Sequence, residues 1–452
     1  MIKPRQARLS RATAAVPAAP VRMLHLGLGN FFRAHQAWYT QHAPDAADWG
    51  IAAFTGRRRH LADALRPQDG LYTLVNRGPR GDEIEVIGSV VAVHEAGDHG
   101  AWLRHFRSPR LAVVTMTVTE AGYQYDPGSP DIAALRQDPA APVSSAPGRL
   151  LGGLMARDRA GLDPVAIVPC DNLPANGDRI SQVLRDMAGQ VGPEAARAVD
   201  RAAAFVNTAV DRITPRAGDA DARTALAATG LRDAAPVVTE PFSQWVLAGK
   251  FPAGRPRWED AGAAFTDDVA PFARRKLWLL NGGHSLLAYL GGIRGHHTVD
   301  QAVQDPVCRA WLEQWWAEAA EQLAAPHDEV AHYRAALVDR FANPRLRHRL
   351  DQIAADGSQK LTVRILPVLR AGPVAARRPR AAVQVLAAWV CHLRGRGAPV
   401  DDPYAQATDA GGPVAAAVPR LLRLLDPGLG QDPDVVAQVA RQVEAIEQQN
   451  PR

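Results

Sequence analysis

The sequence predicts an α/β N-terminal domain of the Rossmann type with a parallel sheet, followed by a mostly α-helical C-terminal domain. Two observations predict this fold class. Up to about residue 265, short apolar runs rich in β-branched residues alternate with helical stretches rich in Ala and Arg, as in parallel sheets covered on both faces. After residue 265 these runs stop, and apolar residues recur with the 3.6-residue period of helices.

A glycine-rich turn follows the first predicted strand. Residues 21–29 read Val-Arg-Met-Leu-His-Leu-Gly-Leu-Gly, a helix is expected over 30–40, and a second strand over 49–54. This order is typical of a dinucleotide-binding unit. Gly27 would allow the tight turn and Gly29 would let the backbone approach a pyrophosphate, so we assign both to cofactor binding, with Asn30 and Phe31. The usual third glycine is replaced by Phe32, so an ordinary turn between strand and helix is the alternative.

The end of the second strand bears on the choice of cofactor. In NAD-binding units an acid there holds the ribose hydroxyls, but Phe54-Thr55-Gly56-Arg57-Arg58 contains none. Arg57 would suit the 2′-phosphate of NADP, and a solvated loop is the alternative. The expected cofactor is therefore NAD or NADP.

The remaining strands and helices follow from the same patterns. Strands are expected over 111–118, 165–168, 203–206 and 236–239, with a helix over 179–198. In the C-terminal half, helices are expected over 269–290, 300–325, 327–341, 344–355, 380–394, 414–425 and 433–447. We divide the chain into a flexible lead-in (1–20), a Rossmann-type NAD(P)-binding domain (21–265) and a helical substrate and catalytic domain (266–452).

Composition excludes several classes of protein. The chain has 452 residues, of which 47% are hydrophobic and 22% charged, as in globular proteins. Its three cysteines lie far apart, which excludes a disulfide framework and a cysteine-based zinc site. It has no run of 18 apolar residues, and its basic residues are interspersed with acids. We expect a cytoplasmic protein that binds neither membrane nor nucleic acid, with no metal; the oligomeric state stays open.

Lysine is rare in this chain: only four of the 52 basic residues are lysines. We therefore expect each lysine to be present for a property that arginine lacks. When buried, the ammonium group of lysine can lose a proton near neutral pH. Lys276 shares the predicted helix 269–290 with Asn281 and His284. On an α-helix, Asn281 lies about 140° and His284 about 80° from Lys276, so all three could line one side facing a cleft.

Gly282 and Gly283 would let another backbone or a ligand approach this helix closely. The alternative is a purely structural role, in which Lys276 extends to solvent, Asn281 caps a turn, and His284 is a core histidine.

Several ordered blocks then resemble the mannitol dehydrogenase family, the polyol-specific long-chain dehydrogenases that include fructuronate and tagaturonate reductases. Lys276-Leu-Trp-Leu-Leu-Asn-Gly-Gly-His284 is similar to the family signature, and His25-Leu-Gly-Leu-Gly-Asn-Phe-Phe-Arg-Ala-His35 to its opening motif. Further blocks with this resemblance are 69–75, 117–123, 170–177, 207–215, 240–246 and 356–360. Together they cover about residues 21–395.

The resemblance implies roles for individual residues. Members transfer hydride between a nicotinamide and a secondary carbinol without a metal. Lys276 resembles the general acid/base, with a pKa expected to be lowered, and Asn281 and Asn172 resemble the amide pair that donates to the developing alkoxide. The implied substrate ligands are His284, Lys360 and Asp211, and Glu120 is a plausible member of the network around the cofactor.

The substrate is a finer question. Polyol-oxidising members tend to carry Arg immediately before the Ile of the block that ends Asp-Gly-Ser-x-Lys, where this chain has Gln352. Residues 340–349 and 356–364 resemble the fructuronate reductase branch, and Arg364, one turn after Lys360, could pair with it on a carboxylate. We expect a hexuronate of the D-fructuronate/D-mannonate type. The alternatives are a mannitol 2-dehydrogenase or other polyol dehydrogenase, and a nucleotide-binding regulator that has lost catalysis.

Overall fold

The computed structural model describes residues 6–56, 59–118, 120–124, 126–371 and 379–449. The chain divides into two compact units, Met1–Ala270 and Pro271–Arg452.

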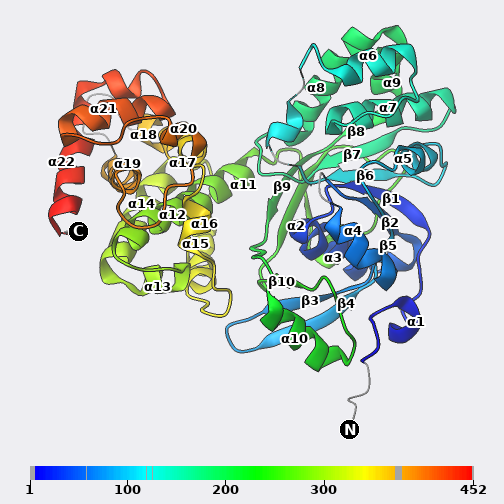
Figure 1. The fold of residues 1–452 in the computed structure, drawn as a ribbon, viewed down its shortest axis with the longest axis horizontal. Helices are drawn as coiled ribbons and strands as arrows, with labels where there is room; N and C mark the ends of the chain where they lie inside the picture. The colour runs from blue at the N-terminus through cyan, green and yellow to red at the C-terminus, as the bar shows by residue number, and fades with distance from the viewer. Residues whose placement is uncertain (1–5, 57–58, 119, 125, 372–378, 450–452) are drawn as a thin grey trace. The chain divides into compact units, whose positions relative to one another are not determined.

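The first unit is built on a six-stranded sheet in which every neighbouring pair is parallel (Figure 1). In spatial order the strands are β5 (Val90–His94), β2 (Gly50–Phe54), β1 (Val21–Leu26), β6 (Val113–Met116), β7 (Val165–Pro169) and β8 (Ala203–Phe205). This order confirms the predicted parallel α/β sheet. The carboxyl ends of β1, β6 and β7 therefore lie side by side at one edge, where ligands bind in sheets of this kind.

Helices cover both faces of this sheet, and the alternation of side chains along each strand explains why. Met23 of β1 belongs to one buried cluster, whereas its neighbours Leu24 and Leu26 belong to the other. One face is covered by α2 (Asn30–Ala34), α3 (Gln36–His42) and α4 (His60–Leu65). The opposite face is covered by α5 (His99–Phe106), α6 (Pro130–Gln137), α7 (Ala146–Arg159), α8 (Asn176–Val191) and α9 (Pro193–Ala202).

Two predicted helices of the first unit are interrupted. The segment 30–40 breaks at His35, whose φ of −121° and ψ of −86° are not helical, and 179–198 breaks at Gly192, with a φ of 143°. Gly192 suits that break because residues other than glycine rarely adopt a φ in this range.

Six strands were not predicted, namely β3 (Tyr72–Arg77), β4 (Asp82–Ile87), β5, β9 (Asn207–Asp211), β11 (Gln244–Ala248) and β12 (Ala264–Phe265). In addition, β10 (Val237–Thr239) was predicted in the wrong sheet: expected with the main sheet, it instead joins β3 and β4. A second small sheet holds β9, β11 and β12, and α10 (Asp219–Thr229) completes the unit.

The segment expected to be a flexible lead-in is attached to the first unit through the backbones of Ala7 and Leu9, which hydrogen-bond to Arg232. It contains α1 (Arg11–Ala14), and Leu9 is fully buried. The Arg11 guanidinium donates to the backbone oxygens of Gly88 and Val90, at 2.7 and 2.8 Å. These hydrogen bonds to carbonyl groups around β5 fix the segment to the sheet.

Among the described residues, the regular elements of the second unit are all helices, beside one isolated β-bridge between Thr298 and Arg349. They are α11 (Ala270–Arg275), α12 (Gly282–Leu286), α13 (Val299–Gln304), α14 (Pro306–Glu321), α15 (His327–Phe341), α16 (Leu350–Ala354), α17 (Gly357–Arg364), α18 (Leu366–Ala371), α19 (Arg380–Leu393), α20 (Pro403–Gln406), α21 (Val414–Leu425) and α22 (Pro433–Gln449). α19 is the buried centre, since every residue from Ala381 to Leu393 is buried. Within the part of the chain that the structure describes, no helix is both long and apolar enough to span a bilayer.

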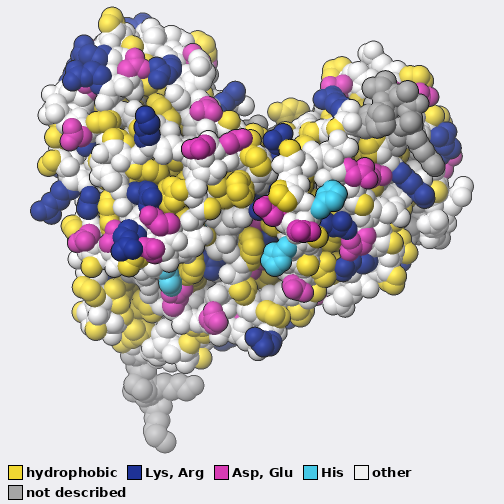
Figure 2. Space-filling model, turned by 180° about the vertical axis from the view of Figure 1, so that it is seen from behind, with side chains coloured by type: hydrophobic (Ala, Val, Ile, Leu, Met, Phe, Trp, Pro, Cys, Tyr) yellow, Lys and Arg dark blue, Asp and Glu magenta, His cyan; other side chains and the backbone are white. Residues whose placement is uncertain are grey.

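The charged surface agrees with the charge pattern of the sequence. On the face shown in Figure 2, Lys and Arg side chains are interspersed with Asp and Glu side chains instead of gathering by sign.

Candidate functional site

The glycine-rich turn follows β1 at the carboxyl edge of the main sheet. Gly27 has a φ of +110°, and a Cβ there would lie 1.9 Å from the backbone oxygen of Thr117, so only glycine fits. At Gly29 a Cβ would meet only the Gly27 oxygen, at 3.5 Å. The backbone of Gly29 thus borders open space at the start of α2, whose first turn has no side-chain cap. Open backbone next to uncapped N–H groups fits the pyrophosphate of a dinucleotide.

Phe32 explains the absence of the third glycine. Its ring stacks on His25, with centroids 3.5 Å apart and planes 7° apart. His25 is hydrogen-bonded through Nδ1 to Thr115 and through Nε2 to Thr117, at 2.8 and 3.1 Å. Burial lowers the pKa of His25 to about 3, so this ring is neutral. Two stacked rings therefore occupy the place where the usual motif has its third glycine.

Arg33 stabilises the glycine-rich turn through hydrogen bonds. This buried guanidinium donates to the Gly29 oxygen (3.3 Å), the Asn30 Oδ1 (2.7 Å) and the Ala235 oxygen. The side chain of Asn30 is therefore engaged within the turn, while Phe31 stacks on His35 at a centroid distance of 4.9 Å.

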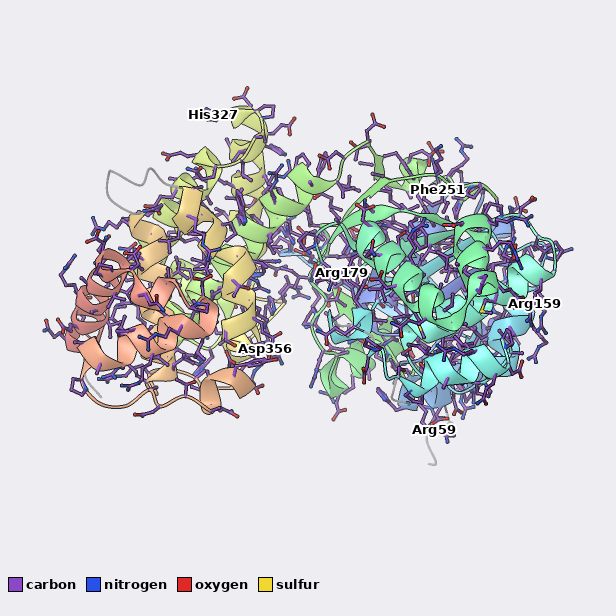
Figure 3. All side chains as sticks on the ribbon, turned by 90° about the horizontal axis from the view of Figure 1, so that it is seen from above. Arg59, Arg159, Arg179, Phe251, His327 and Asp356 are labelled. Atoms are coloured by element: carbon purple, nitrogen blue, oxygen red, sulfur yellow. The ribbon has the colours of Figure 1, made fainter. Side chains whose placement is uncertain are left out.

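The loop after β2 contains no acid in its described part. Thr55 is buried and accepts a hydrogen bond from the Ala96 N–H (3.0 Å), and Gly56 is open to solvent. Arg57 lies outside the described residues. Arg59, at the surface of this unit (Figure 3), is paired with Asp63 and Glu95.

The loop after β7 carries Asn172 and is tied to the loop after β6. Asp171 accepts hydrogen bonds from the Val118 N–H (2.8 Å) and from the Tyr123 hydroxyl (2.6 Å). Burial raises the pKa of Asp171 to about 7, although both hydrogen bonds oppose that rise. The side chain of Asn172 is exposed beside this anchor.

Two further predicted residues belong to this unit. Asp211 is buried at the end of β9. Glu120 starts a short 3₁₀ helix, Glu120–Tyr123, and its side chain lies outside the described part of the structure.

The segment that carries Lys276 differs from the single α-helix predicted over 269–290. It is helical over 270–293 but contains two π-helical stretches, Lys276–Asn281 and Leu287–Gly291, on either side of α12. A π-helix bonds residue i to i+5 and widens the turn, so the predicted angles of 140° and 80° do not apply.

Two tryptophans of α14 account for the first π-helical stretch. The indole of Trp315 donates to the Trp278 oxygen (2.8 Å), and that of Trp316 donates to the Leu279 oxygen (2.9 Å). A Cβ on Gly282 would lie 2.7 Å from the Trp315 ring. The glycine pair therefore admits the side chains of α14, and not the backbone or ligand that the sequence suggested.

Arg364, which could have been a surface residue, joins α17 to the segment that bears Asn281 and His284. Its NH1 donates to Ser285 Oγ (3.1 Å) and to the Asn281 backbone oxygen (3.4 Å). Burial lowers the pKa of Arg364 to about 10, so the group stays protonated at neutral pH.

Lys360 lies one turn earlier on α17, after Asp356, which precedes the helix (Figure 3). Its ammonium donates to the backbone oxygens of Ala355 (2.5 Å) and Ile353 (3.4 Å). Burial, followed by the positive charge of Arg364, lowers the pKa of Lys360 to about 8.

His284 is buried within a set of cations. Its ring stacks on Phe341, with centroids 4.5 Å apart, and its Nε2 has no hydrogen-bond partner among the described residues. Burial lowers the pKa of His284 well below its usual value. The charges that lower it further belong to His348, Arg340, Arg364 and Lys276. Apart from His348, the side chains that act on this imidazole are thus arginine and lysine cations.

Two other features of the second unit lie apart from these residues. A cavity of about 610 Å³ is lined by Gly292, Gly295, His296, His297, Thr298, Arg347, Arg349, Leu350, Asp351, Gly397, Ala398 and Pro399, none of which is a predicted site residue. His296, Asp305 and Cys308 form a potential metal-binding group. Asp305, however, already accepts from Arg294 and His296 and caps α14, which accounts for its conformation without an ion.

Comparison with known proteins now decides the family. The mannitol dehydrogenase Rossmann domain matches residues 21–260, and the mannitol dehydrogenase C-terminal domain matches residues 268–447. The chain belongs to the mannitol dehydrogenase family.

Individual relatives carry different activities in their names. D-mannonate oxidoreductase of Escherichia coli (strain K12) is 38% identical over 365 residues, covering 77% of this chain and 75% of that protein. Mannitol 2-dehydrogenase of Cereibacter sphaeroides is 34% identical over 389 residues, covering 82% and 81%. The solved structure of Pseudomonas fluorescens mannitol 2-dehydrogenase in ternary complex with NAD and D-mannitol superposes with a TM-score of 0.84 at 31% identity, covering 99% and 95%.

These matches confirm the predicted family, the fold class and the enzyme class. The chain is an NAD(P)-dependent oxidoreductase of the mannitol dehydrogenase family, with a Rossmann domain followed by a helical region.

Three side chains around the family's motifs were given no role from the sequence. Ser285 receives Arg364, His348 faces His284, and Asp171 anchors the loop of Asn172. Each directly adjoins or packs on a predicted residue, but only the fold reveals its hydrogen bonds. Position next to a motif was the one signal that the sequence offered.

Proposed function

We propose that this chain catalyses reversible hydride transfer between NAD(P)H and the keto group of a hexuronate of the D-fructuronate/D-mannonate type. The relative named D-mannonate oxidoreductase supports this substrate class. The observation that carries the proposal is the charge around His284.

That charge is strongly positive. The pKa of His284 is lowered by the positive charges of Lys276, Arg340 and Arg364. The charge of Arg364 also lowers the pKa of Lys360. The carboxylates of Asp356, Asp402 and Asp401 act on Lys360 in the opposite sense. Several cations nevertheless act within one region, which favours a ligand that brings negative charge. A uronate carboxylate supplies that charge, whereas a neutral polyol does not. We assign Lys360 and Arg364 to this carboxylate, because a guanidinium and an ammonium on one helical face can bind its two oxygens.

The acid/base chemistry is assigned to Lys276. In reduction its ammonium would give a proton to the oxygen that becomes the hydroxyl, and in oxidation its amine would remove that proton. The amides of Asn281 and Asn172 would donate to the oxygen while it carries negative charge. His284 and Asp211 would bind substrate hydroxyls.

The cofactor is assigned to the first unit. Gly27 and Gly29, with Asn30 and Phe31, would hold the pyrophosphate, and Glu120 would belong to the surrounding network. The bound nicotinamide supplies or accepts the hydride. Arg57 would contact a 2′-phosphate if NADP is the cofactor.

A polyol substrate is the second candidate, and one observation favours it. The structural match to a mannitol 2-dehydrogenase extends over 99% of this chain. Against it, Gln352 of α16 is exposed and uncharged where polyol-oxidising members tend to carry Arg. A catalytically inactive nucleotide-binding regulator would not need Lys276, Asn281, His284 and Asn172, all of which are present.

The test is an initial-rate survey at 340 nm with D-fructuronate, D-tagaturonate and D-fructose, each with NADH and with NADPH. We expect fast cofactor oxidation with a uronate and slow oxidation with fructose. Faster turnover of fructose would make the chain a mannitol-type dehydrogenase. No turnover of any of the three would favour the regulator.

A further inference from the structure

Two histidines of the second unit pack against each other, edge to face. The rings of His284 and His348 have centroids 5.0 Å apart and planes 88° apart. His284 lies on α12, and His348 lies in the loop between α15 and α16.

Each ring turns a buried nitrogen away from solvent. His284 Nε2 and His348 Nδ1 are both buried and have no hydrogen-bond partner among the described residues. A buried polar atom without a partner is unfavourable by about 1–3 kcal/mol, and such atoms are rare in folded proteins. Two of them on rings in contact are natural partners for each other. Hydrogen bonds at active sites are often long without substrate and shorten when substrate binds.

Both rings are held in place by their surroundings. The backbone around His348 pairs with residues 297–299, because the Val299 N–H donates to the His348 oxygen (3.0 Å) and the Leu350 N–H donates to the His297 oxygen (2.9 Å). His284 is held by its stack on Phe341. These contacts keep the two rings next to each other.

We propose that His348 is a positioning residue, which fixes the tautomer of His284 through a hydrogen bond between His348 Nδ1 and His284 Nε2. In the proposed bond the Nδ1–H of His348 donates to Nε2 of His284, so His284 carries its proton on Nδ1. The Nδ1 is then the nitrogen left for a substrate hydroxyl. This use of His284 rests on the proposed function, whereas the pairing of the rings does not.

Burial disfavours a second proton on either ring, and nearby cations add to this effect at His284. The groups that act on His284 are the cations of Arg340, Arg364 and Lys276, together with His348 itself. Burial alone lowers the pKa of His348 to about 4. A second proton on either ring is therefore disfavoured at neutral pH.

Three substitutions of His348 separate hydrogen bonding from packing. In His348→Asn the amide reaches the place of Nδ1, in His348→Gln it reaches that of Nε2, and His348→Phe keeps the ring without nitrogens. We expect His348→Asn to retain kcat/KM within about threefold. We expect His348→Gln and His348→Phe to lose about tenfold, the usual effect of one lost hydrogen bond, mainly through a higher KM. Retained activity in His348→Phe with loss in His348→Asn would show that the ring only packs, and would overturn the proposal.

The tautomer is measured directly by ¹⁵N NMR of the full chain labelled on histidine, with His284→Gln identifying the His284 signals. We expect a single neutral tautomer of His284 in the wild-type protein and in His348→Asn, and a mixed or reversed tautomer in His348→Phe. An unchanged tautomer in His348→Phe would overturn the proposal. This measurement needs no turnover, so it still tests the histidine pair if no uronate or ketose proves to be a substrate and the proposed function fails.

Discussion

Arg364 donates a hydrogen bond to Ser285, with 3.1 Å between NH1 and Oγ. This bond ties α17 to the helical segment of Asn281 and His284, within the second unit. The same helix carries Lys360 one turn before Arg364. In the proposed mechanism these cations recognise the substrate carboxylate, and the segment performs the proton transfer.

Replacing Arg364 should change substrate selectivity more than catalysis. In Arg364→Gln we expect kcat/KM for D-fructuronate to fall by on the order of 10²-fold, because a charge-assisted bond to the carboxylate is lost. For D-fructose the decrease should be much smaller. Arg370→Gln is the matched control, since Arg370 pairs at the surface with Asp426. Equal losses on both substrates would show that Arg364 only supports the fold of the site.

Lys360 should give uronate recognition a pH dependence. Its pKa is lowered to about 8, so the ammonium becomes a neutral amine as the pH rises through that value. The ratio of kcat/KM for D-fructuronate to that for D-fructose should therefore fall above pH 8, while proton transfer by Lys276 affects both rates and cancels. Lys360→Arg, which stays charged, should remove this fall. A ratio that stays constant to pH 9.5 in the wild-type enzyme would exclude Lys360 from carboxylate binding.

Lys276→Ala should separate cofactor binding from turnover. We expect the NADH dissociation constant, followed by fluorescence, to stay near the wild-type value because we assign the pyrophosphate site to the first unit. Turnover should fall by two to four orders of magnitude, the usual contribution of a general acid/base. Lys250→Ala, at an exposed lysine of the first unit, is the control. Near-wild-type turnover in Lys276→Ala would refute the assignment.

The two glycines of the turn should respond differently to alanine. Gly27→Ala should lower the melting temperature strongly or prevent folding, because its Cβ would collide with the Thr117 backbone and its φ is +110°. Gly29→Ala should fold normally but bind NADH more weakly, since its Cβ enters the open space assigned to the pyrophosphate. Gly56→Ala is the control, because nothing lies within 4 Å of its Cβ position. Unchanged NADH affinity in Gly29→Ala would move the pyrophosphate away from this turn.

The parallel sheet and the helical second half could be predicted because their patterns are local. Buried parallel strands such as β6 and β7 are continuous apolar runs, and amphipathic helices show their period directly. The small sheets could not be predicted in the same way. β10 resembles a strand of the main sheet, and its pairing with β3 depends on contacts between residues more than 160 positions apart.

The candidate site could likewise be predicted only in part. Family motifs identified Lys276, Asn281 and His284, but angles on an ideal α-helix were wrong because Trp315 and Trp316 bind the carbonyls of a π-helical stretch. Likewise, the packing of Phe32 on His25 explains the missing glycine only once the rings are seen together. Long-range side-chain contacts of this kind leave no periodic signal in a sequence.

Recognition of a substrate carboxylate is tested most directly by competition in a single reaction. D-fructuronate and D-fructose are offered at equal concentration with limiting cofactor, and the two products are quantified. We predict that D-mannonate exceeds mannitol by at least about 10²-fold, the selectivity expected when a carboxylate meets buried cations. An equal yield, or an excess of mannitol, would contradict a hexuronate site at Lys360 and Arg364.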